Sequence, residues 1–352
     1  MKSYFRPEID AMAGYVPGEQ PKLPNLVKLN TNENPYPPSP QVQEVIANFN
    51  YSALRRYPDP TADALRDEIA SQLGVTRNQI IMGNGSDDIL TMVFRAFTAP
   101  DRPLACLDPT YSLYIELAKI QNAPVIRIGL DPNDFSMPKN VLEQAAKANL
   151  LIITRPNAPT GNSFPREQMR DLCKNFDGIV LFDEAYVDFA EDNCLEFALL
   201  FDNTIVARTF SKSYSLAGLR LGYAVGNPEL IKGLFKIKDS YNLDSLTQLI
   251  GRVAFADRNY HQKCCEQIKT IRTWLEGELI KIGFRVIPSQ TNFLFASPPN
   301  GDGQSYFARL RAQSIIVRYF PGAVTGKFVR ITVGTPEEMN RLLAATRDFY
   351  QK

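Results

Sequence analysis

Histidine is almost absent from this chain of 352 residues, in which His261 is the only one. Hydrolysis by a Ser-His-Asp triad, proteolysis by a Cys-His pair and histidine-rich metal sites all depend on imidazole side chains. The composition therefore disfavours each of these chemistries. We expect His261 itself to lie on the surface of a helix.

The cysteines are few, and their spacing shows no pattern. They are odd in number and form no C-x-x-C motif, which argues against a disulfide framework and against a zinc site. We expect buried or incidental thiols and no bound metal. The cysteines are Cys106, Cys173, Cys194, Cys264 and Cys265.

A strong net charge and a long apolar run are also missing. Lys and Arg number 39 against 38 Asp and Glu, so the formal net charge is +1. No field over the whole molecule exists to hold nucleic acid or an anionic membrane. The longest apolar stretches, such as 150–153, have the length of a strand, and residues 1–10 contain no long apolar run. We expect a protein of the reducing cytoplasm that binds anions locally.

The chain does contain enough apolar material for a sizeable core. Hydrophobic residues make up 44% and charged residues 22% of the sequence, which indicates a globular protein of more than one domain. Short apolar runs alternate with amphipathic stretches to about Ala256, as in a mostly parallel sheet wrapped by helices. We expect an α/β domain over 29–257, a smaller α+β domain over 258–352, and an extended arm over 1–28 that packs with the smaller domain.

The periodicity predicts individual elements. Strands of the large domain are expected at 104–107, 125–128, 150–154, 179–182, 204–208 and 222–225. Its helices are expected at 61–73, with Thr61 as the N-cap, at 86–97 and at 165–175. The smaller domain is expected to contain a long helix at 261–282, strands at 284–287, 292–295, 315–319 and 328–333, and a last helix at 336–349.

A candidate anion site lies in Gly83-Asn84-Gly85-Ser86-Asp87, which follows an apolar strand and opens a helix. The first amides of a helix have no partner within it and carry the positive end of its dipole, so they suit a phosphate. The alternative is an ordinary glycine turn without a ligand. Neither G-x-G-x-x-G nor G-x-x-x-x-G-K-[ST] occurs here, which disfavours a dinucleotide or ATP.

Two further residues follow predicted strands. Asp183 comes directly after 179–182, and Lys212 follows 204–208 in Ser211-Lys212. The carboxyl ends of parallel strands are where α/β proteins bind ligands. Taken alone, Asp183 is equally an ordinary loop cap and Lys212 an ordinary surface charge.

Together these residues meet the needs of pyridoxal 5′-phosphate. This cofactor requires an amine for its aldehyde, a carboxylate that keeps its ring nitrogen protonated, and groups that neutralise a phosphate of about −1.5 to −2. Three motifs occur in matching order: Arg155-Pro156-Asn157-Ala158-Pro159-Thr160-Gly161, Asp183-Glu184-Ala185-Tyr186, and Ser211-Lys212 followed by Leu216-Ala217-Gly218-Leu219-Arg220. In these motifs the chain resembles fold-type I aminotransferases, which depend on this cofactor. The resemblance implies a large domain with a mostly parallel, seven-stranded sheet and a smaller α+β domain.

The resemblance also implies a role for each matching residue. Lys212 would bind the cofactor covalently and then act as the proton-transfer base, and Asp183 would pair with the ring nitrogen. Asn157 and Tyr186 would hydrogen-bond the ring's phenolic oxygen, and Tyr111 would stack on the ring. The phosphate would be held by backbone amides of Gly85, Ser86 and Asp87, the hydroxyl of Ser211 and the guanidinium of Arg220.

Further segments narrow the resemblance to histidinol-phosphate aminotransferases. They are 14–21, 29–36, 56–59, 316–320 and 329–335. The resemblance implies that Tyr57 reaches the cofactor phosphate of the neighbouring subunit in a homodimer. It also implies that Tyr15, Asn34, Arg318 and Arg330 contact the substrate, with the two arginines holding its anionic group.

One residue departs from the family pattern. Many relatives carry a second asparagine before Pro-Thr-Gly, and that asparagine usually meets the phenolic oxygen, but this chain has Ala158 there. Either a small backbone shift brings Asn157 to the oxygen, or Tyr186 holds it alone.

The reaction that the resemblance implies is amino transfer from L-histidinol phosphate to 2-oxoglutarate, on the way to histidine. A first alternative is an aromatic amino-acid aminotransferase, because an aromatic ring beside an anion fits the same pocket. A second is threonine-phosphate decarboxylase, which breaks a different bond. The last is a non-enzymatic regulator with the same fold, which the retained Lys212 and the lack of a basic helix-turn-helix segment in residues 1–80 disfavour.

Overall fold

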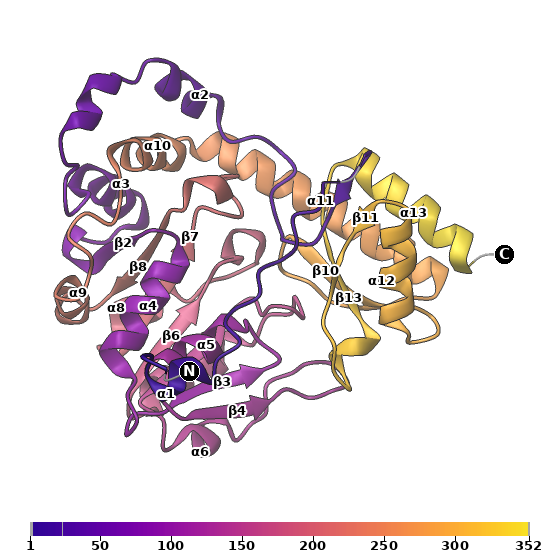
Figure 1. The fold of residues 1–352 in the computed structure, drawn as a ribbon, viewed down its shortest axis with the longest axis horizontal. Coiled ribbons are helices and arrows are strands. Elements are labelled where there is room, and N and C mark those ends of the chain that lie inside the picture. Colours follow the sequence, from indigo (N-terminus) through magenta and orange to yellow (C-terminus); the bar gives the residue numbers. More distant parts are fainter. Residues whose placement is uncertain (1–2, 23, 351–352) are drawn as a thin grey trace.

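A seven-stranded sheet forms the centre of the computed structural model, which describes residues 3–22 and 24–350 (Figure 1). Its strand order is β2-β8-β7-β6-β5-β3-β4, and β8 runs antiparallel to both of its neighbours. The strands are β2 Ile80–Gly83, β3 Leu104–Asp108, β4 Val125–Gly129, β5 Leu150–Thr154, β6 Ile179–Asp183, β7 Thr204–Thr209 and β8 Gly222–Gly226. The mostly parallel sheet predicted from the sequence is confirmed.

The strands of this sheet are continuous apolar runs because helices cover both faces. Alternate residues of β5 face different cores: Leu151 and Ile153 pack with helices on one face, and Leu150 and Ile152 with helices on the other. The first face is covered by α6 Val141–Ala145, α7 Arg166–Asn175 and α8 Leu195–Leu200. The second is covered by α4 Ser86–Phe97, α5 Leu113–Ile120 and α9 Pro228–Phe235.

A third core lies beside β2 and β8, where helices from distant parts of the chain meet. Here α10 packs against α2 and α3. These elements are α2 Pro40–Ala47, α3 Asp63–Leu73 and α10 Ser245–Ala256, with the short 3-10 helix η1 Tyr51–Arg55 between α2 and α3.

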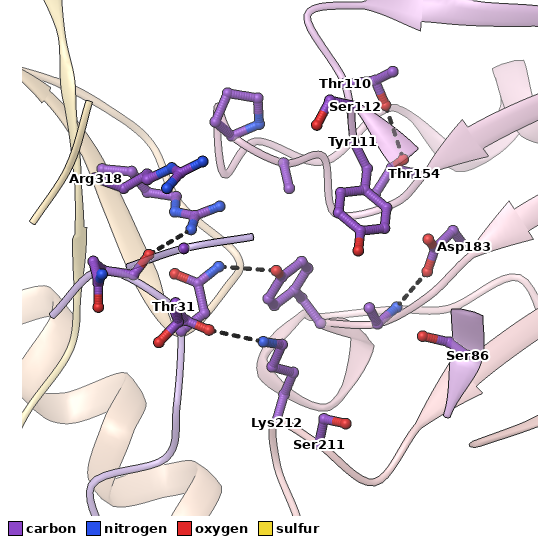
Figure 2. Close-up of a pocket in the computed structure, with 18 of the residues that line it drawn as sticks. Thr31, Ser86, Thr110, Tyr111, Ser112, Thr154, Asp183, Ser211, Lys212 and Arg318 are labelled. Carbon is purple, nitrogen blue, oxygen red and sulfur yellow. Dashed lines mark hydrogen bonds between the residues drawn. The ribbon is translucent and has the colours of Figure 1, made fainter. Parts of the chain in front are cut away.

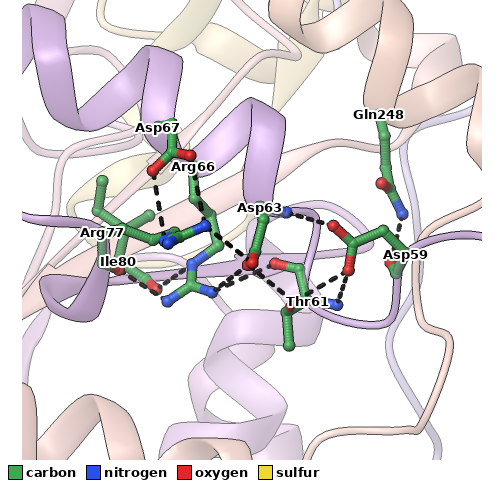
Figure 3. Close-up of polar contacts among 8 residues, drawn as sticks. All are labelled: Asp59, Thr61, Asp63, Arg66, Asp67, Arg77, Ile80 and Gln248. Carbon is green, nitrogen blue, oxygen red and sulfur yellow. Dashed lines mark hydrogen bonds and ion pairs between the residues drawn. The ribbon is translucent and has the colours of Figure 1, made fainter.

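The start of α3 differs from the prediction that Thr61 caps it. The N-cap is Ala62, in the left-handed conformation and without a side-chain cap, and the amide of Asp63 instead donates to the carboxylate of Asp59 at 2.7 Å. Asp59 also accepts from the amide of Thr61 at 2.9 Å (Figure 3). A carboxylate reaches further along the turn than a hydroxyl and carries the charge that a helix N-terminus favours.

A buried arginine ties α3 to the first strand of the sheet. Arg66 donates to the carbonyl oxygens of Ile80, at 3.0 Å, and Arg77, at 2.7 Å, and pairs with Asp63 at 3.1 Å (Figure 3). Since β2 begins at Ile80 and leads into α4, these bonds fix the strand that precedes the predicted phosphate turn.

The C-terminal part forms a four-stranded sheet in the order β12-β13-β10-β9. Its elements are α11 Arg258–Ile282, β9 Arg285–Ile287, β10 Phe293–Ser297, α12 Gly303–Ala312, β12 Arg318–Tyr319, β13 Val329–Thr332 and α13 Pro336–Tyr350. Ile268, Ile271, Leu275, Leu279 and Ile282 of α11 recur at helical spacing and join the core of this sheet. Figure 1 shows α11 running from α10 to the small sheet.

The expected strand at 315–319 proves to be two strands in different sheets. Ile315–Ile316 forms β11, which pairs in parallel with β1, Val27–Lys28, from the N-terminal arm. Arg318–Tyr319 pairs with β13 instead. The arm also reaches the large sheet's helices: α1, Pro7–Asp10, lies against α5, and Arg6 donates to the carbonyl of Ile120 at 2.9 Å.

His261 is buried, so the expectation of a surface histidine is wrong. Only 8% of the residue is exposed, and its ring stacks on Tyr214 with centroids 4.0 Å apart. The expectation for the thiols is confirmed, since all five cysteines are free and buried.

Candidate active site

A pocket of about 670 Å³ opens at the carboxyl edge of the large sheet (Figure 2). Four parallel strands end at its wall, with their last residues among the lining side chains: Asp108, Thr154, Asp183 and Thr209. The small sheet and the arm close the other side. This placement is the one that open parallel sheets give their ligands.

Lys212 points into this pocket from the loop after β7, and its amine donates to the carbonyl of Thr31 at 3.0 Å (Figure 2). Burial lowers the pKa of Lys212 to about 8, and the charge of Arg330 adds to the shift. About half of the amine is therefore uncharged near pH 8, and the uncharged state is the one in which nitrogen is nucleophilic.

Asp183 ends β6 on the pocket wall and is 4% exposed. One oxygen accepts the hydroxyl of Tyr114 at 2.6 Å and the other accepts the amide of Ala185 at 3.1 Å. Burial raises the pKa of Asp183 to about 6, although both hydrogen bonds oppose the shift. A buried carboxylate without a cationic neighbour in contact is suited to a ligand that brings a positive charge or an N–H donor.

Tyr186 and Tyr111 give the pocket its aromatic walls. The hydroxyl of Tyr186 accepts a hydrogen bond from Asn32 at 2.8 Å. Burial raises the pKa of Tyr186, so this hydroxyl keeps its proton and can donate it to a ligand oxygen. Tyr111 meets the ring of Tyr114 edge-on, with centroids 5.5 Å apart, and presents its own ring to the cavity (Figure 2).

One end of the pocket is built for an anion. Ser86 and Asp87 begin α4 there, so the amides of its first turn point at the cavity. Arg220 pairs with the carboxylate of Asp87 at 3.0 Å and lies 3.4 Å from the hydroxyl oxygen of Ser211. Helix amides, a hydroxyl and a guanidinium together make a phosphate site.

The glycines around this end permit its close packing. A Cβ on Gly222 would lie 2.6 Å from the amide nitrogen of Ser86, and one on Gly85 would lie 2.6 Å from the guanidinium of Arg220. Gly85 also has φ +80°, a conformation that other residues rarely adopt. Both positions therefore require glycine.

The opposite end carries two arginines from paired strands. Arg318 of β12 lies opposite Arg330 of β13, and both line the pocket. Arg330 donates to the carbonyl of Asn30 at 2.9 Å, but its Nε is buried and has no hydrogen-bond partner among the described residues. The ring of Phe320 lies under both guanidinium groups, at 5.6 Å and 5.3 Å. An unpartnered donor beside a second positive charge calls for an anionic ligand.

The structure brings most of the predicted site residues together. Those that line the pocket are Tyr15, Ser86, Asp87, Tyr111, Asp183, Tyr186, Ser211, Lys212, Arg220, Arg318 and Arg330. Gly85 contributes through its close contact with Arg220, as described above.

Asn34 and Asn157 do not line the pocket in this structure. The amide of Asn34 donates to the backbone carbonyls of Lys212 and Ser213, each at 3.1 Å. Asn157 is fully buried and donates to Thr160 at 2.7 Å, while Ala158 faces the cavity. Of the two alternatives for the phenolic oxygen, this arrangement favours Tyr186.

Tyr57 is also remote from the pocket of its own chain. It is 81% exposed and stacks on Tyr241 with centroids 4.5 Å apart.

Asn32, Thr31 and Tyr114 were not predicted, yet each contacts Tyr186, Lys212 or Asp183. Asn32 lies in the 29–36 segment, but in a stretch without periodicity nothing distinguishes it from Asn34.

The donor set fits pyridoxal 5′-phosphate. The amine of Lys212 and the buried carboxylate of Asp183, which suits a ring nitrogen, line the same pocket, and helix amides with Arg220 occur at one end for a phosphate. The unpartnered Nε of Arg330 leaves an anion site at the other end for a second molecule.

Comparison with known proteins agrees with this geometry. The family model for class I and II aminotransferases matches residues 24–345, and the chain belongs to that family. It is similar over nearly its whole length to curated histidinol-phosphate aminotransferases. Identity is 42% over 349 residues with the Trichormus variabilis protein, covering 99% of both chains, and 45% over 345 residues with that of Citrifermentans bemidjiense, covering 98% of both.

Solved structures confirm the fold class. Histidinol-phosphate aminotransferase from Sinorhizobium meliloti, in complex with pyridoxal-5′-phosphate, superposes with a TM-score of 0.90 at 24% identity, covering 100% of this chain and 98% of that one. Aspartate aminotransferase from Thermus thermophilus gives a TM-score of 0.79 at 20% identity, covering 91% and 90%.

Two further findings concern residues 3–22 and 24–350. No helix there is long and apolar enough to cross a membrane. Nor does that part of the chain gather three or more His, Cys, Asp or Glu side chains in a group able to hold a metal ion.

Proposed function

We propose that this chain uses pyridoxal 5′-phosphate to transfer the amino group of L-histidinol phosphate to 2-oxoglutarate, yielding imidazole acetol phosphate and L-glutamate. The observation that carries the proposal is the position of Lys212, between a buried carboxylate, a phosphate site and a pair of arginines. Such a protein would act in histidine biosynthesis.

The residues at the centre would divide the work between binding and proton transfer. The cofactor, when bound, supplies an electron sink that stabilises negative charge at the substrate carbon next to nitrogen. Asp183 would hold the ring N–H, and its low-dielectric site strengthens that contact. Tyr186, oriented by Asn32, would donate to the phenolic oxygen, and Tyr111 would cover the ring face.

Lys212 would have two tasks. Its uncharged amine would bind the cofactor's aldehyde carbon, and once the substrate amine replaced it, the freed amine would take the proton from the substrate carbon. The lowered pKa suits both tasks, because an ammonium group can do neither. Before the cofactor binds, the carbonyl of Thr31 would hold the amine toward the cavity.

The arginine pair would select the substrate. Two guanidinium groups at one end can hold the phosphate of histidinol phosphate in one half-reaction and the distal carboxylate of glutamate in the other. The lone Nε of Arg330 would gain the partner it lacks. Tyr15 lies edge-on to Tyr111, with centroids 5.9 Å apart, beside the path of the substrate.

The same aromatic wall supports an aromatic amino acid as a second candidate donor. Tyr15, Tyr111 and Phe320 present rings to the pocket, and a phenyl ring would pack on them as an imidazole does. The pair of arginines favours the donor with the doubly charged group.

The working unit would be a homodimer with shared sites. Tyr57 lies in an exposed apolar stretch with Tyr51, 82% exposed, and Leu54, 57% exposed. A cluster of exposed apolar side chains indicates a surface covered by a partner. In a twofold dimer each chain would give its Tyr57 to the phosphate site of the other.

The test combines a donor panel with chemical labelling. Histidinol phosphate, phenylalanine and tyrosine at equal concentration, each with 2-oxoglutarate, should give the highest kcat/KM for histidinol phosphate. After borohydride reduction, the reduced cofactor should be found on Lys212, and Lys212→Ala should carry none, while Lys238→Ala should be labelled normally.

Three results would contradict the proposal. A higher kcat/KM for phenylalanine would show that the preferred donor is an aromatic amino acid. Release of carbon dioxide instead of a keto product would show that the reaction is a decarboxylation. Label on another lysine would show that Lys212 is not the residue that binds the cofactor.

A further inference from the structure

The residue after the active-site lysine makes a contact that the proposed reaction does not use. Ser213 is 3% exposed, and its hydroxyl donates to the carboxylate of Asp188. Asp188 lies in the short helix η3, Val187–Phe189, directly after Tyr186. One hydrogen bond thus joins the loop of Lys212 to the segment that carries Tyr186.

The only histidine of the chain meets the same carboxylate. Nε2 of His261, on α11, lies 3.6 Å from Oδ2 of Asp188, the oxygen that also accepts from Ser213. The stack of His261 on Tyr214, with 15° between the ring planes, fixes the imidazole from the other side. Although burial opposes it, the neighbouring His261 holds the pKa of Asp188 well below its usual range, with help from Arg208 and Ser213. Asp188 is therefore an anion and a strong acceptor.

The backbone of the loop is held as well. As described above, the side chain of Asn34 donates to the carbonyls of both Lys212 and Ser213. The loop is therefore held by Asn34, by Asp188 of η3 and by His261 of α11, which are far apart in the sequence.

We propose that Asp188, His261 and Asn34 are positioning residues that hold the Lys212 loop. Because they fix the backbone of the loop, only the side chain of Lys212 has to move between cofactor binding and proton transfer. The proposal rests on the proposed function in taking Lys212 as the residue that binds the cofactor. Proton transfer demands such precision, because a displacement of about 1 Å can lower a rate by about 100-fold. The buried histidine thus supports the lysine without touching the substrate.

The test compares two buried serines. Ser213→Ala removes the hydroxyl that binds Asp188. Ser289→Ala is the matched control, because Ser289 is also buried and donates to the carbonyl of Phe293 at 2.6 Å, but in the turn between β9 and β10. His261→Phe is the second variant, since it retains an aromatic ring beside Tyr214 and removes the nitrogen near Asp188.

Two measurements separate positioning from plain stability. The first is amide hydrogen exchange of residues 210–216, with and without pyridoxal 5′-phosphate. The second is the split between kcat and KM. We expect Ser213→Ala and Ser289→Ala to lower Tm by similar amounts, but only Ser213→Ala to speed exchange of 210–216 and to lower kcat about tenfold at unchanged KM. His261→Phe should likewise speed exchange of 210–216 and lower kcat.

Each contrary outcome would overturn a different claim. If Ser213→Ala matches Ser289→Ala in exchange and in kcat, the proposal is overturned. If His261→Phe leaves both unchanged while Ser213→Ala does not, His261 is not a positioning residue. If borohydride labels a lysine other than Lys212, the proposed function fails, and exchange in the cofactor-free protein still decides whether these residues hold the loop.

Discussion

Lys212 and Asp183 show the same physical effect with opposite signs. Burial lowers the pKa of Lys212 to about 8 and raises that of Asp183 to about 6. In both residues burial disfavours the charged form, and in Lys212 the opposite charges of Glu33 and Asp87 offset only part of that effect. Both groups are thus more easily held in their neutral forms than they would be in water. A ligand that supplies a partner of opposite charge to either group gains binding free energy from that interaction.

The first prediction concerns the pH dependence of cofactor capture. Only the uncharged amine of Lys212 attacks an aldehyde, so the capture rate of cofactor-free protein should rise with pH and level off above about 8. The growth of absorbance after mixing with pyridoxal 5′-phosphate, from about pH 6 to about pH 10, measures it. Arg330→Leu should move the midpoint upward, since the charge of Arg330 helps to lower the pKa. A midpoint near the ordinary 10.5 would disprove the shift.

The second prediction is that Asp183→Asn loses activity but stabilises the cofactor-free protein. The folded pKa of about 6 exceeds the ordinary 3.8, so the contribution of Asp183 to stability is present below about pH 4 and is lost as pH rises through 6. At pH 8 the variant should therefore be more stable by about 2–3 kcal/mol, and at pH 4 it should equal the wild type.

Urea unfolding at the two pH values measures this difference, with the exposed Asp177→Asn as the control. With cofactor, kcat of Asp183→Asn should fall by about 100-fold or more, because the ring nitrogen loses its charged partner. An unchanged kcat would remove the electron-sink role from Asp183.

At the scale of elements, local pattern predicted the strands and helices well where pairing is regular. Each predicted strand of the large sheet was found, because strands covered on both faces are distinctive apolar runs. The run 315–319 was predicted as one strand because periodicity does not report the partner. Its two halves pair with β1 and β13, which lie almost the whole chain apart.

The site residues show the same limit. Lys212 and Asp183 follow regular strands, and their positions were predictable from the order of elements. Asn32 lines the pocket and donates to Tyr186, but the sequence does not distinguish it from Asn34, because residues 29–36 have no repeat from which a facing side can be read. His261 was placed on the surface because its partners, Asp188 and Tyr214, come from two other segments.

The third prediction belongs to the pair β12 and β13. Because Arg318 and Arg330 are direct neighbours across these strands, removing one leaves a single guanidinium for the substrate anion. Arg330→Ala should lower kcat/KM for histidinol phosphate and for glutamate alike, by about 10- to 100-fold, since charged hydrogen bonds are worth about 1.5–3 kcal/mol. Steady-state kinetics with each substrate measures the loss.

Arg285→Ala is the control for this variant. Arg285 belongs to the same sheet, on β9, and does not line the pocket. Its kinetics should equal those of the wild type. Normal kinetics for both substrates in Arg330→Ala would mean that the anion is bound elsewhere.

For the whole molecule, the fourth prediction is complementation between two inactive subunits. Lys212→Ala and Tyr57→Ala, unfolded and refolded together, should form heterodimers in which one of the two sites has both native residues. The activity of the mixture should exceed the average of the two parents. Mixing the folded proteins without unfolding is the control, and native mass spectrometry counts the heterodimers. Heterodimers that give only the average would mean that Tyr57 does not act on its partner's site.

The pairing of β1 with β11 has a consequence for the newly made chain. The pocket takes Thr31 from the N-terminal part, Lys212 from the middle and Arg330 from β13, and the arm gains its strand partner only at Ile315–Ile316. A ribosome releases these parts in order, at about 5–20 residues per second. The large sheet is complete at β8, more than 100 residues before Arg330 is added. During that interval the growing polypeptide contains Lys212 but lacks the substrate site. The chain can therefore bind substrate only after its last strand, β13, has been made.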